Sequence, residues 1–429
     1  MLVLPLRLCQ RASQTLHSSL VWTRGLICPP EYGEDAFLSS TDIINIFTEK
    51  SVGKNSYFNP SGTFIRDSIS DEMIPKSQEE LPLRRMIDSF ERAVIPLSKD
   101  LKLRDRYTTS LGQVRYGRLL EDMDVFSVYL CYKHLHHPNQ GAISPFTVVT
   151  ALVDRLKIIS NLSIEEDIRM SGQVTWSGSS SLEASIEIHQ GKGSNWHKCV
   201  DATFLLASRN PSNTGKSYVN KLQLDTPEEK ALFQQGANNK RARLNDKKEG
   251  LFDKAPKQEE GQLVHDMFVK TLDNSSLSFK SRVIPPNSIW MEDAKLKTVK
   301  LCQPENRNRF NKIFGGFIMR EAAELAWMNA YTYSGQVPSF YHIDDIIFRK
   351  PVEIGSIMYM NSQVCFTHEN FVQIRVSAEI FNPETKKNSI SNVFEFTFKN
   401  NYDVPMVMPK TYQEAIMFIN ARRHFLSIF

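Results

Sequence analysis

The chain has 429 residues, of which 41% are hydrophobic and 23% are charged, and its formal net charge is +4. This length suits two or three domains, and the composition is ordinary for a globular protein. The first 30 residues carry three arginines and no acidic residue, so the rest of the chain is close to neutral. A near-neutral protein lacks the broad positive field that attracts polyanions, which argues against a nucleic-acid partner.

Residues 1–24 have the composition of a mitochondrial presequence, because they are apolar, contain Ser and Arg, and lack acidic residues. A secretory signal would need an unbroken apolar stretch, whereas Arg7, Gln10 and Arg11 interrupt this one early. The alternative is an N-terminus that carries no targeting signal. Nowhere in the chain do about 18 uncharged apolar residues run together, so no integral membrane segment is expected. We therefore predict a protein of the mitochondrial matrix.

Residues 25–83 do not repeat elsewhere in the chain and predict an N-terminal extension. Of the six cysteines, Cys131, Cys199, Cys302 and Cys365 have neither CxxC nor other ligand-like spacing. They are typical of reduced, buried thiols, so we expect no metal, no thiol nucleophile and no cofactor.

An internal duplication organises the remainder of the chain. The sequence SFERAVIP at residues 89–96 returns as SFKSRVIP at residues 278–285. Downstream, each copy has a helix that begins with glycine, at residues 117–124 and 315–324. Alternating apolar and polar segments that predict strands then follow in the same order in both copies. These strands are 147–159, 170–176, 182–188 and 200–207 in the first copy, and 340–348, 357–366, 371–380 and 392–399 in the second.

Each copy therefore predicts a strand, one long helix and about four antiparallel strands, which is an α+β layout with the helix on one sheet face. We expect these two domains at residues 84–209 and 266–401. Residues 210–265 are highly charged and predict a solvated linker with short helices, such as 227–235. Residues 402–429 predict a C-terminal amphipathic helix.

Three segments resemble the acyl-CoA thioesterase branch of the hot-dog superfamily. Residues 311–319, NKIFGGFIM, match the family's Asn and Phe-Gly-Gly at the start of its central helix. Residues 343–355, IDDIIFRKPVEIG, match its Val-Asp-x-Ile-x-Phe and Pro-Val-x-x-Gly. In the first copy, GRLLEDMD at residues 117–124 resembles Gly-x-Leu-Leu-x-x-Met-Asp. The resemblance spans residues 84–400.

The resemblance implies a tandem hot-dog fold, in which each half wraps an antiparallel β-sheet around a long central helix. It implies an enzyme that hydrolyses fatty acyl-CoA to free fatty acid and CoA, with the active site shared between the halves. It also implies a homo-oligomer.

Hydrolysis of a thioester needs hydrogen-bond donors for the developing oxyanion and an activated water or nucleophile. A helix N-terminus offers unpaired N–H groups, and glycine lets a substrate approach them closely. The N–H of Gly316, next to Gly315, fits this role. Asn311 can hold the attacking water or donate to the oxyanion, with Asn308 as the second candidate. The structural alternative for the two glycines is an ordinary tight turn before a helix.

Asp124 lies about two helical turns beyond Gly117 and next to apolar residues. A carboxylate in such surroundings needs a partner or has a function. We predict that Asp124 is the general base, or a nucleophile that forms a transient anhydride. The alternative is a solvated helical aspartate beside Glu121 and Asp122.

The reciprocal site is degraded. The first copy has Gly117-Arg118 where the second has two glycines, and Ala323 stands at the position of Asp124. Glu324 comes one residue late, which turns its side chain by about 100° around the helix. We therefore predict one working site per chain, with Glu324 as a backup carboxylate.

The phosphates of CoA need cations, and Arg349 and Lys350 are the best placed on motif grounds, with Gly315 beside the substrate. The chain has no GxSxG, HExxH, P-loop or GxGxxG motif. Two alternatives stay open. One is a non-catalytic acyl-CoA or fatty-acid sensor, which the degraded second site suggests. The other is a hot-dog hydratase, although neither copy has that family's Asp-x-x-x-x-His pair.

Overall fold

The computed structural model describes residues 38–39, 74–138, 144–192, 195–210, 215–248, 250–273, 275–276, 278–308, 312–348 and 350–428. The predicted presequence, most of the predicted N-terminal extension, Asn311 and Arg349 lie outside the described residues.

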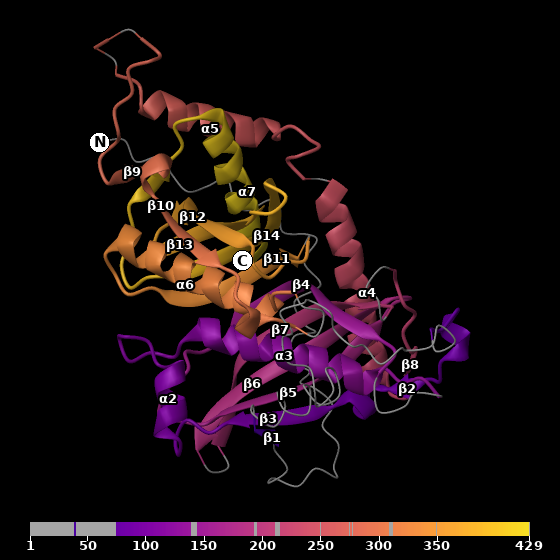
Figure 1. Ribbon diagram of the computed structural model, residues 1–429. Coiled ribbons are helices and arrows are strands. Elements are labelled where there is room, and N and C mark those ends of the chain that lie inside the picture. The colour runs from indigo at the N-terminus through magenta and orange to yellow at the C-terminus, as the bar shows by residue number, and fades with distance from the viewer. Residues whose placement is uncertain are drawn as a thin grey trace.

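One eleven-stranded sheet runs through both halves of the molecule, in the order β1-β3-β5-β6-β7-β4-β11-β14-β13-β12-β10 (Figure 1). The first half contains β1 (Leu38–Ser39), β3 (Glu91–Ile95), β4 (Thr147–Ile158), β5 (Ile168–Ser177), β6 (Ser181–Lys192) and β7 (Asn195–Arg209). The second contains β10 (Lys295–Leu301), β11 (Ser339–Phe348), β12 (Ile357–His368), β13 (Phe371–Asn382) and β14 (Lys387–Lys399). The halves join where β4 pairs with β11 in antiparallel register.

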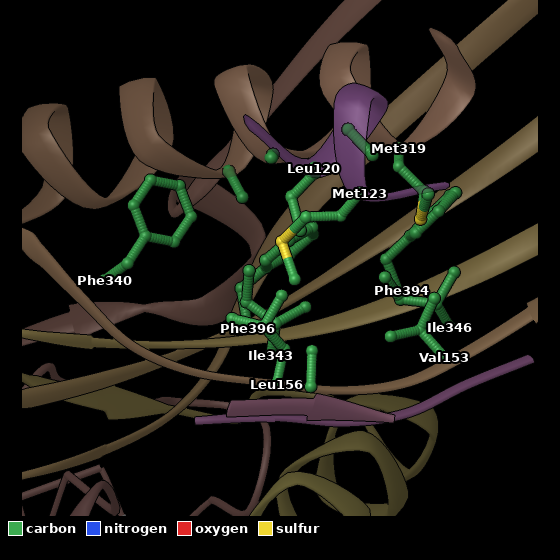
Figure 2. Packing of buried hydrophobic residues seen from close by; sticks show 14 of the residues in the cluster. Leu120, Met123, Val153, Leu156, Met319, Phe340, Ile343, Ile346, Phe394 and Phe396 are labelled. Carbon is green, nitrogen blue, oxygen red and sulfur yellow. The ribbon is translucent and has the colours of Figure 1, made fainter. Parts of the chain in front are cut away.

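Two long helices, α3 (Tyr116–His134) and α6 (Gly315–Ser334), pack against each other and against one face of this sheet (Figure 1). Figure 2 shows their apolar stripes lying on inward side chains of the central strands. The labelled residues are Leu120, Met123, Val153, Leu156, Met319, Phe340, Ile343, Ile346, Phe394 and Phe396. Fully buried alanines on α6, such as Ala322 and Ala326, allow close packing of the helix. At its C-terminus, Gly335 takes a left-handed conformation, which glycine adopts without a Cβ clash.

Each half has the same order of elements: a short strand, a long helix and four antiparallel strands. This arrangement confirms the predicted α+β tandem hot-dog fold, and the eight predicted strands after the helices correspond to β4–β7 and β11–β14. The predicted first strand of the second copy, at residues 278–285, is wrong. That segment has a single bridge from Leu272 to Arg282, and Val283 in it is 56% exposed. The first strand of the second half is β10, at the edge of the sheet, and burial alternates over its residues 295–299.

The segment between the halves contains α4 (Pro227–Lys248) and α5 (Gln258–Lys270). The prediction of a solvated linker with a short helix at 227–235 requires correction, because α4 is longer and packs on β5. The backbone of Gly236 lies against Trp176, and Arg243 forms an ion pair with Asp154 at 2.7 Å. Asp154 follows the inward Val153 on β4, so α4 covers the sheet face opposite α3.

The C-terminal helix α7 (Tyr412–Ile428) packs on β12 and β13. The remaining short elements are α2 (Leu101–Tyr107), η2 (Gln78–Glu80), η3 (Met86–Ser89), η4 (Met291–Asp293), η5 (Pro304–Asn306) and the strand pairs β2 (Arg84–Arg85) with β8 (Leu222–Gln223) and β9 (Ser288–Trp290) with β15 (Met406–Met408). Within the described residues, no helix has the length and apolar character required to cross a bilayer.

Candidate active site

A cavity of about 390 Å³ lies where the start of α6 meets the middle of α3 and the first residues of β4. Four of the residues singled out from the sequence line it together, although they come from both halves of the chain: Asp124, Asn308, Gly315 and Lys350. Glu324 lies elsewhere, in a second cavity. The fold therefore brings the predicted carboxylate of the first half to the glycine-led helix start of the second.

Asp124 is fully buried in the wall of this cavity. Its Oδ1 accepts a 2.7 Å hydrogen bond from the hydroxyl of Thr150, while its Oδ2 has no hydrogen-bond partner among the described residues. Burial raises the pKa of Asp124 to about 7. The Thr150 hydroxyl and the N–H of Gly316 limit this rise, and the negative charge of Glu121 adds to it. A carboxylate with a pKa near neutrality is suited to accept a proton from water.

Thr150 reaches Asp124 because of an irregularity in β4. The pairing of β4 with β7 shifts register between Thr150 and Leu152, which inserts one extra residue at this point. In a regular strand, an inward Thr150 would place Asp154 inward as well. The bulge instead directs both Thr150 and Val153 toward the helices, and leaves Asp154 on the other face with Arg243. The alternation of inward and outward residues along a strand did not identify Thr150 as a site residue, because the bulge interrupts that alternation.

The start of α6 needs both of its glycines. A Cβ on Gly316 would lie 3.0 Å from the Cα and the carbonyl oxygen of Glu121, so the two helices touch backbone to backbone here. A Cβ on Gly315 would lie 3.3 Å from Oδ2 of Asp124 and 3.2 Å from the ring of Phe348. The first turn of α6 therefore begins beside the carboxylate. Its N–H groups have no partner within the helix, and the N–H of the buried Gly316, which does not line the cavity, interacts with Asp124 itself.

Asn308 lies in the segment that precedes α6, and it lines the cavity. Its side-chain Oδ1 accepts a 3.2 Å hydrogen bond from the N–H of Lys312, and its own N–H donates to the carbonyl of Lys312 at 2.7 Å. Because Oδ1 accepts this hydrogen bond, the other end of the Asn308 amide is its NH₂ group, which is a hydrogen-bond donor. Of the two predicted asparagines, Asn308 is the one that the structure describes in the cavity.

The cavity lies beside the end of the described pairing between β4 and β11. The described pairing of these strands runs from Leu152 with Ile347 to Lys157 with His342, and residues 147–151 extend past it. Among residues 147–151 of β4, Val148 and Thr150 point inward, toward the helices. Val149, Ala207 and Arg209 alternate with the inward residues and lie on the opposite face, yet they also line the cavity. The opening therefore leads to the outer face, where Arg209 and Lys350 supply positive charge.

The repeat places a second cavity, of about 420 Å³, at the start of α3. A Cβ on Gly117 would lie 3.1 Å from the carbonyl oxygen of Arg320, just as one on Gly316 would lie 3.0 Å from that of Glu121. Asp124 is three residues beyond Glu121, and the residue three beyond Arg320 is Ala323, which is fully buried. The second cavity therefore has no carboxylate at the equivalent position.

Glu324 is part of the wall of the second cavity, but it is paired. Its two carboxylate oxygens accept hydrogen bonds of 2.7 and 3.0 Å from the guanidinium of Arg115. This two-point contact with arginine occupies both oxygens of the Glu324 carboxylate.

An ion cluster fixes the two helices relative to each other next to the first cavity. Glu121 contacts Arg118 at 2.6 Å and Arg320 at 2.7 Å, and all three side chains are mostly buried. Asp122 is buried and accepts a hydrogen bond from the hydroxyl of Tyr107, away from the cavity. The alternative of a solvated Asp124 beside two solvated acids is therefore wrong.

Other chemistries find little support in the described part of the chain. No group of three or more His, Cys, Asp or Glu side chains there is arranged to hold a metal ion. Burial raises the pKa of Cys131 and of Cys365, which keeps both thiols protonated and inert.

No protein-family model matches the chain. Among solved structures, an oleoyl thioesterase (putative) from Lactobacillus plantarum shares 9% identity, covers 74% of this chain and 96% of its own, and has a TM-score of 0.41.

Two curated relatives are far more similar in sequence. Acyl-coenzyme A thioesterase 9, mitochondrial, from Homo sapiens is 44% identical over 356 residues, which are 83% of this chain and 81% of the relative. Acyl-coenzyme A thioesterase 10, mitochondrial, from Mus musculus is 41% identical over 357 residues with the same coverage. With this identity over most of both lengths, the chain belongs to the acyl-coenzyme A thioesterase family that includes the mitochondrial types 9 and 10.

Proposed function

We propose that this protein hydrolyses fatty acyl-CoA to free fatty acid and CoA, at one composite site per chain. The observation that carries the proposal is a fully buried carboxylate, Asp124, whose pKa is about 7 and which faces the glycine-led start of α6. The names of the two relatives, which are both acyl-CoA thioesterases, support the substrate class.

In the reaction, the thioester carbonyl lies at the first turn of α6, and a water molecule lies between it and Oδ2 of Asp124. Asp124 takes a proton from the water while the water oxygen bonds to the carbonyl carbon. The N–H of Gly316 and the NH₂ of Asn308 stabilise the oxyanion that results. The C–S bond then breaks, the carbonyl re-forms, and the CoA sulfur takes the proton from Asp124. Thr150 is a positioning residue, because it acts through the carboxylate.

A direct attack by Asp124 on the carbonyl would form an acyl anhydride, which water then opens. Single-turnover hydrolysis in ¹⁸O-labelled water tests for the anhydride route. Label in Asp124 would show that route, because labelled water that attacks the Asp124 carbonyl of an anhydride leaves its oxygen in the enzyme, whereas a general base keeps its own oxygens. Asn311, which the sequence motif favours, remains a proposed contributor from the sequence.

The CoA end of the substrate is proposed to lie at the outer opening, where Lys350 and Arg209 face the phosphates and Gly315 lies beside the thioester. Arg349 remains a proposed contact from the sequence motif. Lys350→Glu and Arg209→Glu should each raise KM for acyl-CoA severalfold at low salt with little change in kcat, because they act on binding alone. Equal KM values for variants and wild type would exclude these cations.

The mitochondrial names of the relatives and the composition of residues 1–24 support a location in the mitochondrial matrix. Fractionation of mitochondria with protease protection tests it. The family resemblance supports a homo-oligomer, which light scattering of the purified protein tests.

Thiol release from fatty acyl-CoAs by the wild type and by Asp124→Ala tests the proposed activity. Loss of a general base typically costs about 10²–10⁴-fold in kcat, and we expect a loss in this range with acyl-CoA binding retained. Saturable binding without thiol release by the wild type would favour the sensor alternative. Hydration of an unsaturated acyl-CoA without thiol release would favour the hydratase.

A further inference from the structure

The inner end of the Asp124 cavity is formed by one face of α3. Asp124, Val128 and Tyr132 are spaced four residues apart, so they project one above another from the same side of the helix. All three line the cavity. We propose that this end receives the acyl chain and that Tyr132 closes it, so that Tyr132 sets the longest acyl chain that binds readily. The inference rests on the thioesterase function proposed above.

Tyr132 is fixed across the space between α3 and β4. Its hydroxyl accepts a 3.2 Å hydrogen bond from the N–H of Val148 and donates a 3.4 Å hydrogen bond to the carbonyl of Phe146. Val148 is the second residue of β4, and the fully buried Phe146 immediately precedes that strand. Because the ring is held from the helix at one end and from the strand at the other, it forms a floor rather than a mobile side chain.

The distribution of charge decides which end of the substrate meets this floor. Between Asp124 and Tyr132 the wall is apolar and includes Val128, Val148 and Ile318. Arg209 and Lys350 also line the cavity; Arg209 pairs with Thr147, next to Val148, and lies on the outer face of the sheet, across the strands from the Tyr132 ring. An acyl-CoA has one apolar and one polyanionic end, so burial of the apolar end and attraction of the phosphates favour the same orientation.

The spacing along the two elements gives the length of this inner end. Eight residues of α3 separate Asp124 from Tyr132, which is about 12 Å along the helix axis. On β4, the two residues from Thr150 to Val148 span about 7 Å. A short or medium-length acyl chain fits a compartment of about 7–12 Å. A long chain meets the Tyr132 ring and binds only if the ring moves.

The test compares kcat/KM for butyryl-, octanoyl- and palmitoyl-CoA in full-length wild type and three variants. Tyr132→Ala removes the floor, and we expect the palmitoyl-to-butyryl ratio to rise about tenfold or more. Val128→Phe fills the compartment, and we expect the octanoyl-to-butyryl ratio to fall about tenfold. Tyr129→Phe is the matched control, because Tyr129 contacts Glu91 and does not line the cavity, and its ratios should equal those of wild type.

The melting temperature of each variant reports whether it folds. If Tyr132→Ala does not fold, Val128→Phe still tests the inference. Unchanged chain-length ratios in a folded Tyr132→Ala or Val128→Phe enzyme that still releases thiol would overturn the inference and leave the proposed function intact. A wild type that prefers palmitoyl-CoA over octanoyl-CoA would also overturn it. No thiol release by the wild type from any of the three substrates would overturn the proposed function and this inference together.

Discussion

Thr150→Val removes the hydroxyl that donates to Asp124 and keeps the shape of the side chain. A hydrogen bond to a charged group stabilises it by about 1.5–3 kcal/mol, and one pKa unit corresponds to about 1.4 kcal/mol. The bond favours the ionised form of Asp124, whose pKa is about 7 in its presence. Without the hydroxyl, the pKa of Asp124 should therefore rise by roughly one to two units.

The assay is thiol release measured as kcat/KM from about pH 5.5 to about pH 10. A general base works only when ionised, so kcat/KM should fall tenfold per pH unit below the apparent pKa. In Thr150→Val this acid limb should move to higher pH by one to two units, while the alkaline plateau changes much less. Thr147→Val is the control, because Thr147 lies on the same strand but on its other face. A uniform loss at every pH, with the limb unmoved, would refute the reasoning.

The remaining predictions concern stability and packing. Burial raises the folded pKa of Asp124 from 3.8 to about 7, so its ionisation destabilises the fold as pH rises through that interval. At pH 8 the free energy of unfolding of Asp124→Asn should therefore exceed that of wild type by up to about 4 kcal/mol. Calorimetry should show a higher melting temperature at pH 8, and the difference should vanish below about pH 4. Gly315→Val should abolish most thiol release because its side chain would meet Asp124, whereas Gly261→Ala, with open space around it, should not. Gly236→Leu should lower the melting temperature by several degrees, because even a Cβ there would lie 2.4 Å from Trp176; an unchanged value would mean that α4 is not packed.

Periodicity and glycine placement made most of the fold predictable. The strands after each helix follow from alternation, and the close contact of Gly316 with Glu121 explains why the glycine pair at the start of α6 was informative. Asp124 could be identified because a carboxylate among apolar helix residues requires a reason. Residues 278–285 were wrongly predicted to be the first strand of the second half, because their sequence is similar to that of β3. The alternation of residues in β10 is the better indication of that strand.

The remaining site residues depend on three-dimensional features that local sequence does not encode. Thr150 faces Asp124 only because of the bulge in β4, which interrupts the alternation from which inward residues are predicted. Arg209 comes to the cavity only because β7 pairs with the start of β4, where Arg209 lies opposite Thr147. Asn308 lines the cavity from a turn in which its Oδ1 accepts a hydrogen bond from the N–H of Lys312. The floor at Tyr132 depends on its contact with the start of β4.

The central claim is that one composite site per chain uses the carboxylate of Asp124, and that Glu324 in the second cavity is a paired structural residue. Thiol release by Asp124→Asn and by Glu324→Gln, measured side by side on the same acyl-CoA, tests it most directly. We predict a loss of about 10²-fold or more for Asp124→Asn and activity within about twofold of wild type for Glu324→Gln. Equal losses in both variants, or an active Asp124→Asn enzyme, would contradict the account.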